Sequence, residues 1–360
     1  MSAVRVMIVE DSPTAREFLR QAVEADPRLA VVAACGSAEE ALAALERSAP
    51  DVISMDIHLP RMGGLEATRR IMETRPTPIV IVSRSVNAQE LDSTMDALRA
   101  GAVSAVEKPS PLGCGGAKDA AARICRELFV MSQIKVVRQR FNGPRAAARK
   151  TPASVWRGNG RPPMAPGKPA RMLGIVASSG GPHAVETVLA SLGAEFPLPI
   201  VLVQHMTASF HAGFVSWLDR ISPQPVEVAC DGDLPEAAHV YVAPENKHLF
   251  LRGDRLIVSD GAAVNGQRPS GDVLLRSLAE ELGPQAVGVV LTGMGNDGAE
   301  GLLAIRRAGG YTIAEDESTA VVNGMPEVAR RIGAACVSLP LGSIGAAIKN
   351  LMPVRQEVRS

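Results

Sequence analysis

Three polar residues in the second half of the chain have the types that hydrolyse an ester or an amide. Ser178, His205 and Asp297 each follow closely on a separate apolar, β-branched run. A serine hydroxyl can attack a carbonyl carbon, a histidine can take its proton, and an aspartate can orient the histidine. If the three side chains meet, the sequence predicts a serine hydrolase.

The apolar runs predict the strands that must bring these residues together. Runs at 173–177, 199–203 and 287–291 are each followed by a helical pattern, which is typical of a mostly parallel, doubly wound α/β sheet. The carboxyl ends of parallel strands lie on one rim of the sheet, so the three polar residues are expected there. Shorter extended segments between them are expected to form hairpins at one edge, namely 226–229, 239–243, 249–251 and 256–258.

Within this site His205 is expected to take the Ser178 proton and Asp297 to fix its tautomer. Backbone N–H groups after the nucleophile, together with that of Met294, are expected to hold the developing oxyanion, and Ser179 to assist there. Two alternatives stay open at this point. The serines can simply cap the following helix, and His205 can be a structural histidine.

Other catalytic chemistries fit this half less well. The remaining histidines show no HExxH spacing, and the GMGNDG segment at 293–298 lacks both GxGxxG and a P-loop lysine. We therefore expect no metal or nucleotide cofactor in this domain. The order Ser, His, Asp and the absence of a GxSxG elbow indicate an unusual α/β scaffold for a hydrolase.

The first 124 residues alternate five β-branched runs with amphipathic segments, which predicts a flavodoxin-like (βα)5 domain. The runs are 4–9, 29–34, 52–55, 79–82 and 103–106, and the helical segments are 13–25, 38–47, 64–74, 89–99 and 117 onward.

Polar residues again follow the strands of this first domain. Glu10 and Asp11 follow the first strand, Asp56 the third, Ser83 the fourth and Lys108 the fifth. Three converging carboxylates repel one another and suit Mg²⁺, and a carboxylate beside Mg²⁺ can attack a phosphoryl group. Ser83 and Lys108 are placed to hold the phosphate oxygens. The five positions together predict a phosphate-accepting switch.

Composition limits the remaining possibilities. The length of 360 residues predicts two domains. Equal numbers of acidic and basic side chains and only 3% aromatic residues argue against a nucleic-acid partner. Five scattered cysteines, no signal peptide and no membrane-length apolar run favour a cytoplasmic protein without direct membrane insertion. A helical pattern continues to about 140, and a basic Pro/Gly-rich linker follows up to 171.

The motifs carry a resemblance to two known families. VEDS at 9–12, MDIHLPRMGG at 55–64 and EKP at 107–109 resemble response-regulator receiver domains. The second half resembles the catalytic domain of the protein-glutamate methylesterases of the CheB family, through VASSGGP at 176–182, VQHM at 203–206, YVAP at 241–244, RPSGD at 268–272, LTGMGNDGAEG at 291–301 and DESTAVVNGMP at 316–326.

This resemblance implies a receiver domain at 1–124, an interdomain helix and linker at 125–170, and a methylesterase domain at 171–353. A chemotaxis-type histidine kinase would phosphorylate Asp56, with Mg²⁺ held by Glu10, Asp11 and Asp56. The activated enzyme would demethylate glutamate γ-methyl esters of methyl-accepting chemoreceptor cytoplasmic domains, releasing methanol, and deamidate receptor glutamines. The unphosphorylated receiver would cover the active site.

The resemblance also implies Ser178 as nucleophile, His205 as base, Asp297 as its partner and Met294 as a backbone oxyanion donor. The chain departs from the family patterns at a few positions, which are Ala105 in place of an aromatic switch residue, Gly63 in place of an acidic residue, Ser179 for threonine, Gly271 for a larger residue and Glu315 for glutamine. The competing hypothesis is a receiver attached to a non-enzymatic binding module, which has no need of a Ser-His-Asp set.

Overall fold

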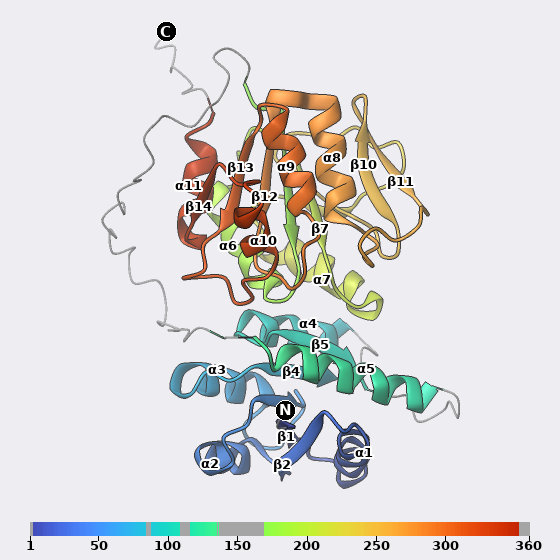
Figure 1. The fold of residues 1–360 in the computed structure, drawn as a ribbon, viewed down its shortest axis with the longest axis vertical. Coiled ribbons are helices and arrows are strands. Elements are labelled where there is room, and N and C mark those ends of the chain that lie inside the picture. Colours follow the sequence, from blue (N-terminus) through green and yellow to red (C-terminus); the bar gives the residue numbers. More distant parts are fainter. Residues whose placement is uncertain (1–2, 84–87, 109–115, 135, 137–168, 353–360) are drawn as a thin grey trace.

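The structure, a computed structural model, shows a smaller α/β domain, the expected receiver domain, and a larger α/β domain stacked along the long axis of the molecule (Figure 1). It describes residues 3–83, 88–108, 116–134, 136 and 169–352, so nearly all of the predicted linker lies outside the described residues. No helix in these ranges combines the length and the hydropathy that a bilayer span requires.

The receiver domain is a five-stranded parallel sheet in the order β2-β1-β3-β4-β5 with helices on both faces, which confirms the predicted fold class. Its strands are β1 (Val4–Val9), β2 (Leu29–Cys35), β3 (Val52–Met55), β4 (Ile79–Ser83) and β5 (Ser104–Glu107). Its helices are α1 (Pro13–Glu24), α2 (Ala38–Ser48), α3 (Gly64–Thr74), α4 (Ala88–Arg99) and α5 (Gly116–Met131).

Helix α5 ends at Met131, so the predicted continuation toward residue 140 is wrong for 132–134. The Gln133 N–H bonds to the Val130 carbonyl, an i to i−3 bond that tightens the last turn. The Ser132 hydroxyl also donates to the carbonyl of Phe129 and competes with the helical pattern. Apolar residues at helical spacing therefore continue past the point where the backbone bonds stop.

The larger domain contains a seven-stranded parallel sheet in the order β14-β13-β12-β6-β7-β9-β8. Its strands are β6 (Met172–Ala177), β7 (Ile200–Gln204), β8 (Val226–Val228), β9 (Val240–Val242), β12 (Ala286–Val290), β13 (Tyr311–Glu315) and β14 (Val337–Leu339). The covering helices are α6 (Gly181–Leu192), α7 (Ala208–Ile221), α8 (Gly271–Leu282), the short η1 (Gly283–Gln285), α9 (Ala299–Arg307), α10 (Met325–Arg331) and α11 (Leu341–Lys349).

One of the expected edge hairpins exists, and the other does not. Strands β10 (His248–Arg252) and β11 (Arg255–Ser259) form an antiparallel hairpin as a separate two-stranded sheet. Strands β8 and β9 instead join the main sheet in parallel register. All three residues of β9 are buried, as expected for a strand that is hydrogen-bonded on both sides and covered on both faces.

The strand order places the three predicted catalytic positions at a switch point of the sheet. Strand β6 lies in the centre, with β7 on one side and β12 on the other. Because the order of the strands reverses beside β6, a crevice opens at the carboxyl ends of these strands. Gly174 in β6 lets α8 pack closely, since a Cβ atom there would lie 2.7 Å from side-chain atoms of Leu275 and Leu278.

The two domains meet through α4 of the receiver, which packs against α6 and α7 (Figure 1). Leu91 fills a notch at Gly213, where a Cβ atom would lie 2.7 Å from the Leu91 Cβ atom. Trp217 donates a hydrogen bond from Nε1 to Asp96 at 3.3 Å. The same receiver helix therefore contributes both apolar packing and polar contacts to the interface.

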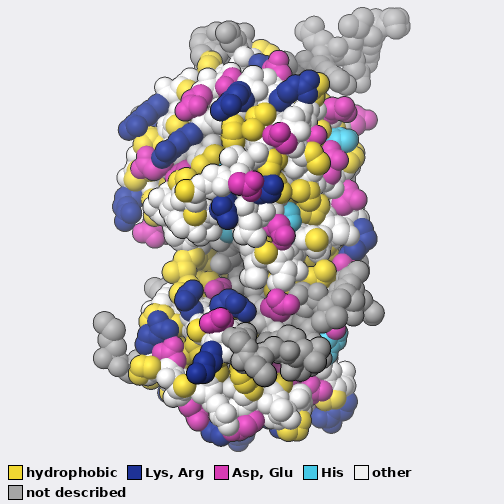
Figure 2. All heavy atoms as spheres, turned by 90° about the vertical axis from the view of Figure 1, so that its right-hand side faces the viewer, with side chains coloured by type: hydrophobic (Ala, Val, Ile, Leu, Met, Phe, Trp, Pro, Cys, Tyr) yellow, Lys and Arg dark blue, Asp and Glu magenta, His cyan; other side chains and the backbone are white. Residues whose placement is uncertain are grey.

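Two ion pairs connect the two domains across this interface. Arg220 of α7 lies 2.9 Å from Asp92, and Arg99 of α4 pairs with Glu186 of α6. Viewed from the side, the molecule shows two lobes with a constriction where they meet (Figure 2). The arginines are about half exposed, so these pairs direct how the domains dock more than they stabilise the fold.

Candidate active site and phosphorylation site

Ser178 lies at the turn between β6 and α6. Its N–H donates to the Thr292 carbonyl at 3.0 Å, and its own carbonyl accepts the Gly181 N–H at 2.8 Å. Gly180 has φ +75, a left-handed conformation that glycine adopts without strain, and it occupies the N-cap position of α6. No side chain caps this helix, so Ser178 and Ser179 do not serve as its caps.

His205 and Asp297 form a buried pair on the same rim. The Nε2 atom of His205 lies 2.9 Å from Oδ2 of Asp297. Both ring nitrogens of His205 are buried: Nδ1 has no hydrogen-bond partner among the described residues, and Nε2 meets Oδ2 of Asp297 at ion-pair distance without hydrogen-bond geometry. With the Nε2 proton directed to Asp297, Nδ1 keeps a lone pair that can accept a proton.

Asp297 is held by the first turn of α8. The Ser270 hydroxyl and the Gly271 N–H donate to its two oxygens at 2.7 and 2.6 Å, and the Asp272 N–H adds a bond of 3.1 Å. Burial works to raise the pKa of Asp297, but these bonds and the one from His205 outweigh it and lower the pKa below its ordinary value. Asp297 is therefore ionised beside His205.

Ser270 is a residue that the sequence reasoning missed. Its N–H donates to Nδ1 of His248 at 3.2 Å, and the Nε2 of that histidine faces the Ala262 carbonyl at 2.9 Å. A serine directly before the apolar pattern of α8 is an N-cap signal, and Ser270 does cap α8 by accepting the Val273 N–H. That signal predicts a helix start, but it does not predict a contact with Asp297, which is 27 residues away.

The loop after β12 packs directly against Ser178, the candidate nucleophile. A Cβ atom on Gly293 would lie 2.7 Å from the Ser178 Cβ atom, so only glycine fits at this contact. Met294 follows it, and its side chain is 43% exposed. Gly293 also pairs with Asn323 in an isolated parallel bridge. The backbone of Met294 is therefore adjacent to the residue that touches Ser178.

A cavity of about 310 Å³ joins this rim to the receiver domain. On the catalytic side it is lined by Ser178, Ser179, Gly180, Pro182, Gln204, His205, Met206, Thr207, Phe210 and Gln267, and on the receiver side by Leu98, Val103, Ser104, Ala105 and Glu127. Ser178, Ser179 and His205 therefore open into one space, and the receiver forms its opposite wall. Asp297 lies behind His205.

Two of the receiver residues on this wall bear on the sequence analysis. Ala105 stands where the family carries an aromatic switch residue, and its small side chain leaves room in the cavity wall. Glu127 was not singled out from the sequence. Burial raises its pKa, against the opposing effect of a hydrogen bond from Ser104. The receiver thus presents a carboxyl group to the cavity that holds Ser178.

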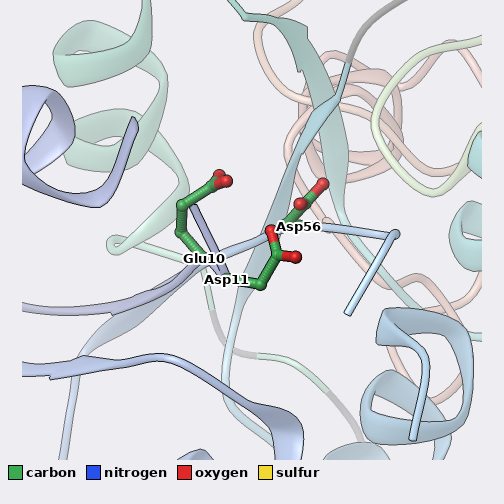
Figure 3. A group of neighbouring side chains, drawn as sticks. All are labelled: Glu10, Asp11 and Asp56. Atoms are coloured by element: carbon green, nitrogen blue, oxygen red, sulfur yellow. The ribbon is translucent and has the colours of Figure 1, made fainter. Parts of the chain in front are cut away.

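The receiver residues expected to accept phosphate lie at the carboxyl ends of the receiver strands. Carboxylate oxygens of Glu10, Asp11 and Asp56 come within 4.8 Å of one another (Figure 3). Lys108 Nζ lies 2.8 Å from Glu10 and 2.9 Å from Asp56. Ser83 is fully buried at the end of β4, and its carbonyl accepts the Lys108 N–H.

The donor set fits a hard divalent cation. Mg²⁺ prefers carboxylate oxygens and keeps several waters, and Asp11 is exposed to solvent while Glu10 and Asp56 are buried. Burial raises the pKa of Glu10, with the nearby Asp56 adding to the rise and Lys108 opposing it. A cation would relieve this repulsion between carboxylates.

Comparisons with known proteins agree with both halves of this arrangement. The model of the CheB methylesterase family matches residues 173–348, and that of the response regulator receiver domain matches 6–113. The chain is similar to protein-glutamate methylesterase/protein-glutamine glutaminase 2 of Paramagnetospirillum magneticum, with 50% identity over 97% of each chain. It is 42% identical to the protein-glutamate methylesterase/protein-glutamine glutaminase of Nitrosospira multiformis over 99% of each chain.

The larger domain also resembles a solved structure. The crystal structure of the Thermotoga maritima CheB methylesterase catalytic domain matches it with a TM-score of 0.50 and 34% identity, covering 51% of this chain and 99% of that one. The receiver, the parallel sheet with its Ser-His-Asp rim and the full-length relatives therefore agree. The chain belongs to the CheB family of receiver-linked protein-glutamate methylesterases/protein-glutamine glutaminases.

Proposed function

We propose that this chain is a phosphorylation-activated hydrolase that demethylates glutamate γ-methyl esters of chemoreceptors and deamidates specific receptor glutamines. The observation that carries the proposal is the cavity shared by Ser178 and His205, with the Asp297 carboxylate 2.9 Å from the Nε2 side of the imidazole. A non-enzymatic binding module has no use for an ionised aspartate held by a helix N-terminus behind a buried histidine.

In the first half of the reaction the Ser178 hydroxyl attacks the ester carbonyl carbon, and His205 Nδ1 takes its proton. Asp297 stabilises the imidazolium that forms. The oxyanion of the tetrahedral intermediate lies beside the Gly293 contact, where we assign the Met294 N–H as a donor, and Ser179 assists from the same wall. His205 then returns the proton to the leaving methanol, and an acyl-enzyme forms on Ser178.

In the second half a water molecule attacks the acyl-enzyme. His205 takes a proton from that water and returns it to Ser178 Oγ as the second tetrahedral intermediate collapses, which breaks the acyl bond, releases the glutamate side chain and restores neutral His205. A glutamine substrate forms a first tetrahedral intermediate with an amino group in place of the methoxy group, loses ammonia after His205 protonates that group, and then shares the acyl-enzyme and the second half of the reaction. One set of three residues therefore serves both reactions, and these residues need no metal or organic cofactor for these steps.

For the receiver we propose Asp56 as the phosphorylated residue and a chemotaxis-type histidine kinase as the phosphodonor. Glu10, Asp11 and Asp56 would hold Mg²⁺, which neutralises the carboxylates and the phosphoryl oxygens when it is bound. Lys108 is positioned to move from Asp56 to the new phosphoryl group, and Ser83 lies at the next strand end. We propose a cytoplasmic location, because the proposed kinase and the proposed receptor domains are cytoplasmic.

Control of the esterase by the receiver follows from the position of the cavity. Receiver residues, among them Ala105 and Glu127, form one wall of the space that contains Ser178, so a receptor helix cannot enter while the domains are docked. Phosphorylation at Asp56 would favour an arrangement in which α4 leaves α6 and α7 and the cavity opens.

The experiment that tests the proposed function is methanol release from a methylated chemoreceptor by the full-length protein. We expect release to rise on addition of Mg²⁺ and a small-molecule phosphodonor, and to be lost in Ser178→Ala. If Ser178→Ala releases methanol at the wild-type rate, the enzyme assignment is wrong. If methanol release depends on Ser178, comparing the rates with several methylated receptors identifies the substrate.

A further inference from the structure

Glu315, the last residue of β13, is a buried acid that the hydrolytic steps above do not use. Its side chain is 0% exposed, and among the described residues no lysine or arginine forms an ion pair with its carboxylate. Burying an unpaired carboxylate costs free energy unless the group takes up a proton. The contacts of Glu315 indicate which part of the site it holds.

One residue connects Glu315 to both active-site serines. Glu315 Oε2 accepts the Thr292 N–H at 2.8 Å. The Thr292 carbonyl accepts the Ser178 N–H at 3.0 Å, and the Thr292 hydroxyl donates to the Ser179 carbonyl at 2.9 Å. Gly293 is the next residue and touches Ser178. Through Thr292, Glu315 therefore fixes the start of the loop after β12, which contains Met294 (the Met294 loop), relative to Ser178.

The surroundings of Glu315 allow both protonation states near neutral pH. Burial raises its pKa to about 7, against the opposing effect of the bonds from Thr292 and Thr319. The charged groups that face it are few. His183 of α6 acts to lower the pKa, Asp316 at the end of β13 acts to raise it, and Arg330 of α10 donates to the Glu315 carbonyl.

A rotatable hydroxyl can satisfy either state. The Thr319 hydroxyl lies 3.0 Å from Glu315 Oε1 and 3.4 Å from the Asp316 carbonyl, while it accepts the Leu341 N–H at 2.9 Å. When Glu315 is ionised, the Thr319 proton points to it. When Glu315 is protonated, it donates to Thr319, and the Thr319 proton turns to Asp316. Neither state leaves a buried oxygen without a partner.

We propose that Glu315 is a positioning residue of the hydrolytic site, which acts through Thr292 on Ser178 and the Met294 loop and supports full activity only in its protonated form. The inference rests on the proposed function. An ionised Glu315 places a negative charge under the loop beside which the oxyanion forms, and in a buried site this charge opposes the transition state more strongly than in water.

The test is the pH dependence of Glu315→Gln relative to the unaltered protein. Glutamine has the shape of protonated glutamic acid, accepts the Thr292 N–H through its oxygen and cannot ionise. At low pH we expect the two proteins to have equal kcat/KM. As the pH rises from about 6 to 8, the kcat/KM of the unaltered protein divided by that of the variant should fall by about fivefold. The change should appear in kcat, with KM unchanged.

Both full-length proteins are assayed for methanol release from a methylated chemoreceptor with Mg²⁺ and a small-molecule phosphodonor. They share one receiver, so the pH dependence of phosphorylation cancels in the ratio. Glu280→Gln, on an exposed face of α8, is the matched control and should give a flat ratio. A flat ratio for Glu315→Gln would overturn the inference, whereas absence of methanol release by the unaltered protein would overturn the proposed function instead.

An infrared measurement tests the protonation state without reference to activity. The carbonyl band of a protonated carboxylic acid should disappear from the unaltered protein as the pH rises through about 7, and this band should be missing in Glu315→Gln. If the titrating band persists in the variant, another carboxyl group is responsible. If the unaltered protein has no such band, Glu315 is ionised throughout and the inference fails.

Discussion

His205 approaches Asp297 through Nε2, at 2.9 Å from Oδ2, and its buried Nδ1 atom is the nitrogen that we propose accepts the Ser178 proton. Two further bonds, from the Ser270 hydroxyl and the Gly271 N–H, fix the carboxylate that faces the ring. The imidazole is therefore oriented by a helix N-terminus acting through a carboxylate. This relationship makes the tautomer of His205 dependent on the charge of Asp297.

Asp297→Asn should lower kcat by about 10⁴-fold with little change in KM. The amide can still accept from Ser270 or Gly271, but its NH₂ group then favours the tautomer of His205 that carries the proton on Nδ1. Steady-state methanol release measures the effect. Asp260→Asn is the control, because Asp260 is an exposed loop residue. A loss below about tenfold would show that Asp297 does not set the tautomer.

Ser178→Ala and Ser179→Ala should separate the nucleophile from its neighbour. Both residues line the cavity, and Ser178 is the one whose Cβ and N atoms lie nearest to Gly293. We expect Ser178→Ala to lose at least about 10³-fold in kcat and to form no acyl-enzyme, and Ser179→Ala to lose about 10-fold. Mass spectrometry of the trapped intermediate tests this directly. An acyl group on Ser179 would reverse the assignment.

The proposed catalytic residues could be placed from the sequence because Ser178 and His205 come at the ends of apolar strands and Asp297 lies in the loop that follows a third, and strand ends of a parallel sheet share one rim. Ser270 could not be placed in this way, since its contact with Asp297 depends on how closely α8 packs on β6. Strand β13 was missed, and with it the position of Glu315 beneath Thr292. A sequence pattern shows which face of an element is apolar, but it does not show which side chains meet across two elements.

The interdomain cavity could not be predicted from the sequence. Ala105 was recognised as a departure at a switch position, but its place opposite Ser178 depends on the docking of two separate domains. The residues that direct the docking, Asp92 and Arg220 among them, are ordinary helix-surface charges until the domains meet. Charges of this kind carry no periodic signal. The predicted hairpin of β8 and β9 failed for a related reason, because short apolar segments fit either arrangement.

Asp56→Asn should abolish stimulation by the phosphodonor while leaving the basal rate of methanol release within about twofold of the unaltered protein. The amide cannot be phosphorylated, and Asp56 lies outside the cavity that contains Ser178. Rates measured with and without the phosphodonor provide the comparison. Loss of all activity would mean that the receiver does more than cover the site.

Reversing one charge at the domain interface should open the site without phosphorylation. Arg220→Glu places two carboxylates together at Asp92, and because an exposed pair contributes at most about 1 kcal/mol, we expect a rise in basal activity of about 2- to 5-fold. Adding Asp92→Arg restores opposite charges and should return the basal rate. If the double variant stays as active as the single one, the effect is not due to this pair.

Glu315→Gln should also change how stability depends on pH, independently of catalysis. The folded-state pKa of about 7 lies above the ordinary value of 4.5, so the unfolded chain ionises first. Between these two values the native state holds more protons, and stability is lost as the pH rises from about 4.5 to 7 and then levels off. The glutamine variant escapes this loss and should be more stable at pH 8 by an amount on the order of 3 kcal/mol at most, with no difference near pH 4. Denaturant unfolding at both pH values measures the difference, and Glu280→Gln provides the baseline. Equal unfolding free energies at pH 8 would show that Glu315 ionises as readily in the folded protein as in the unfolded chain.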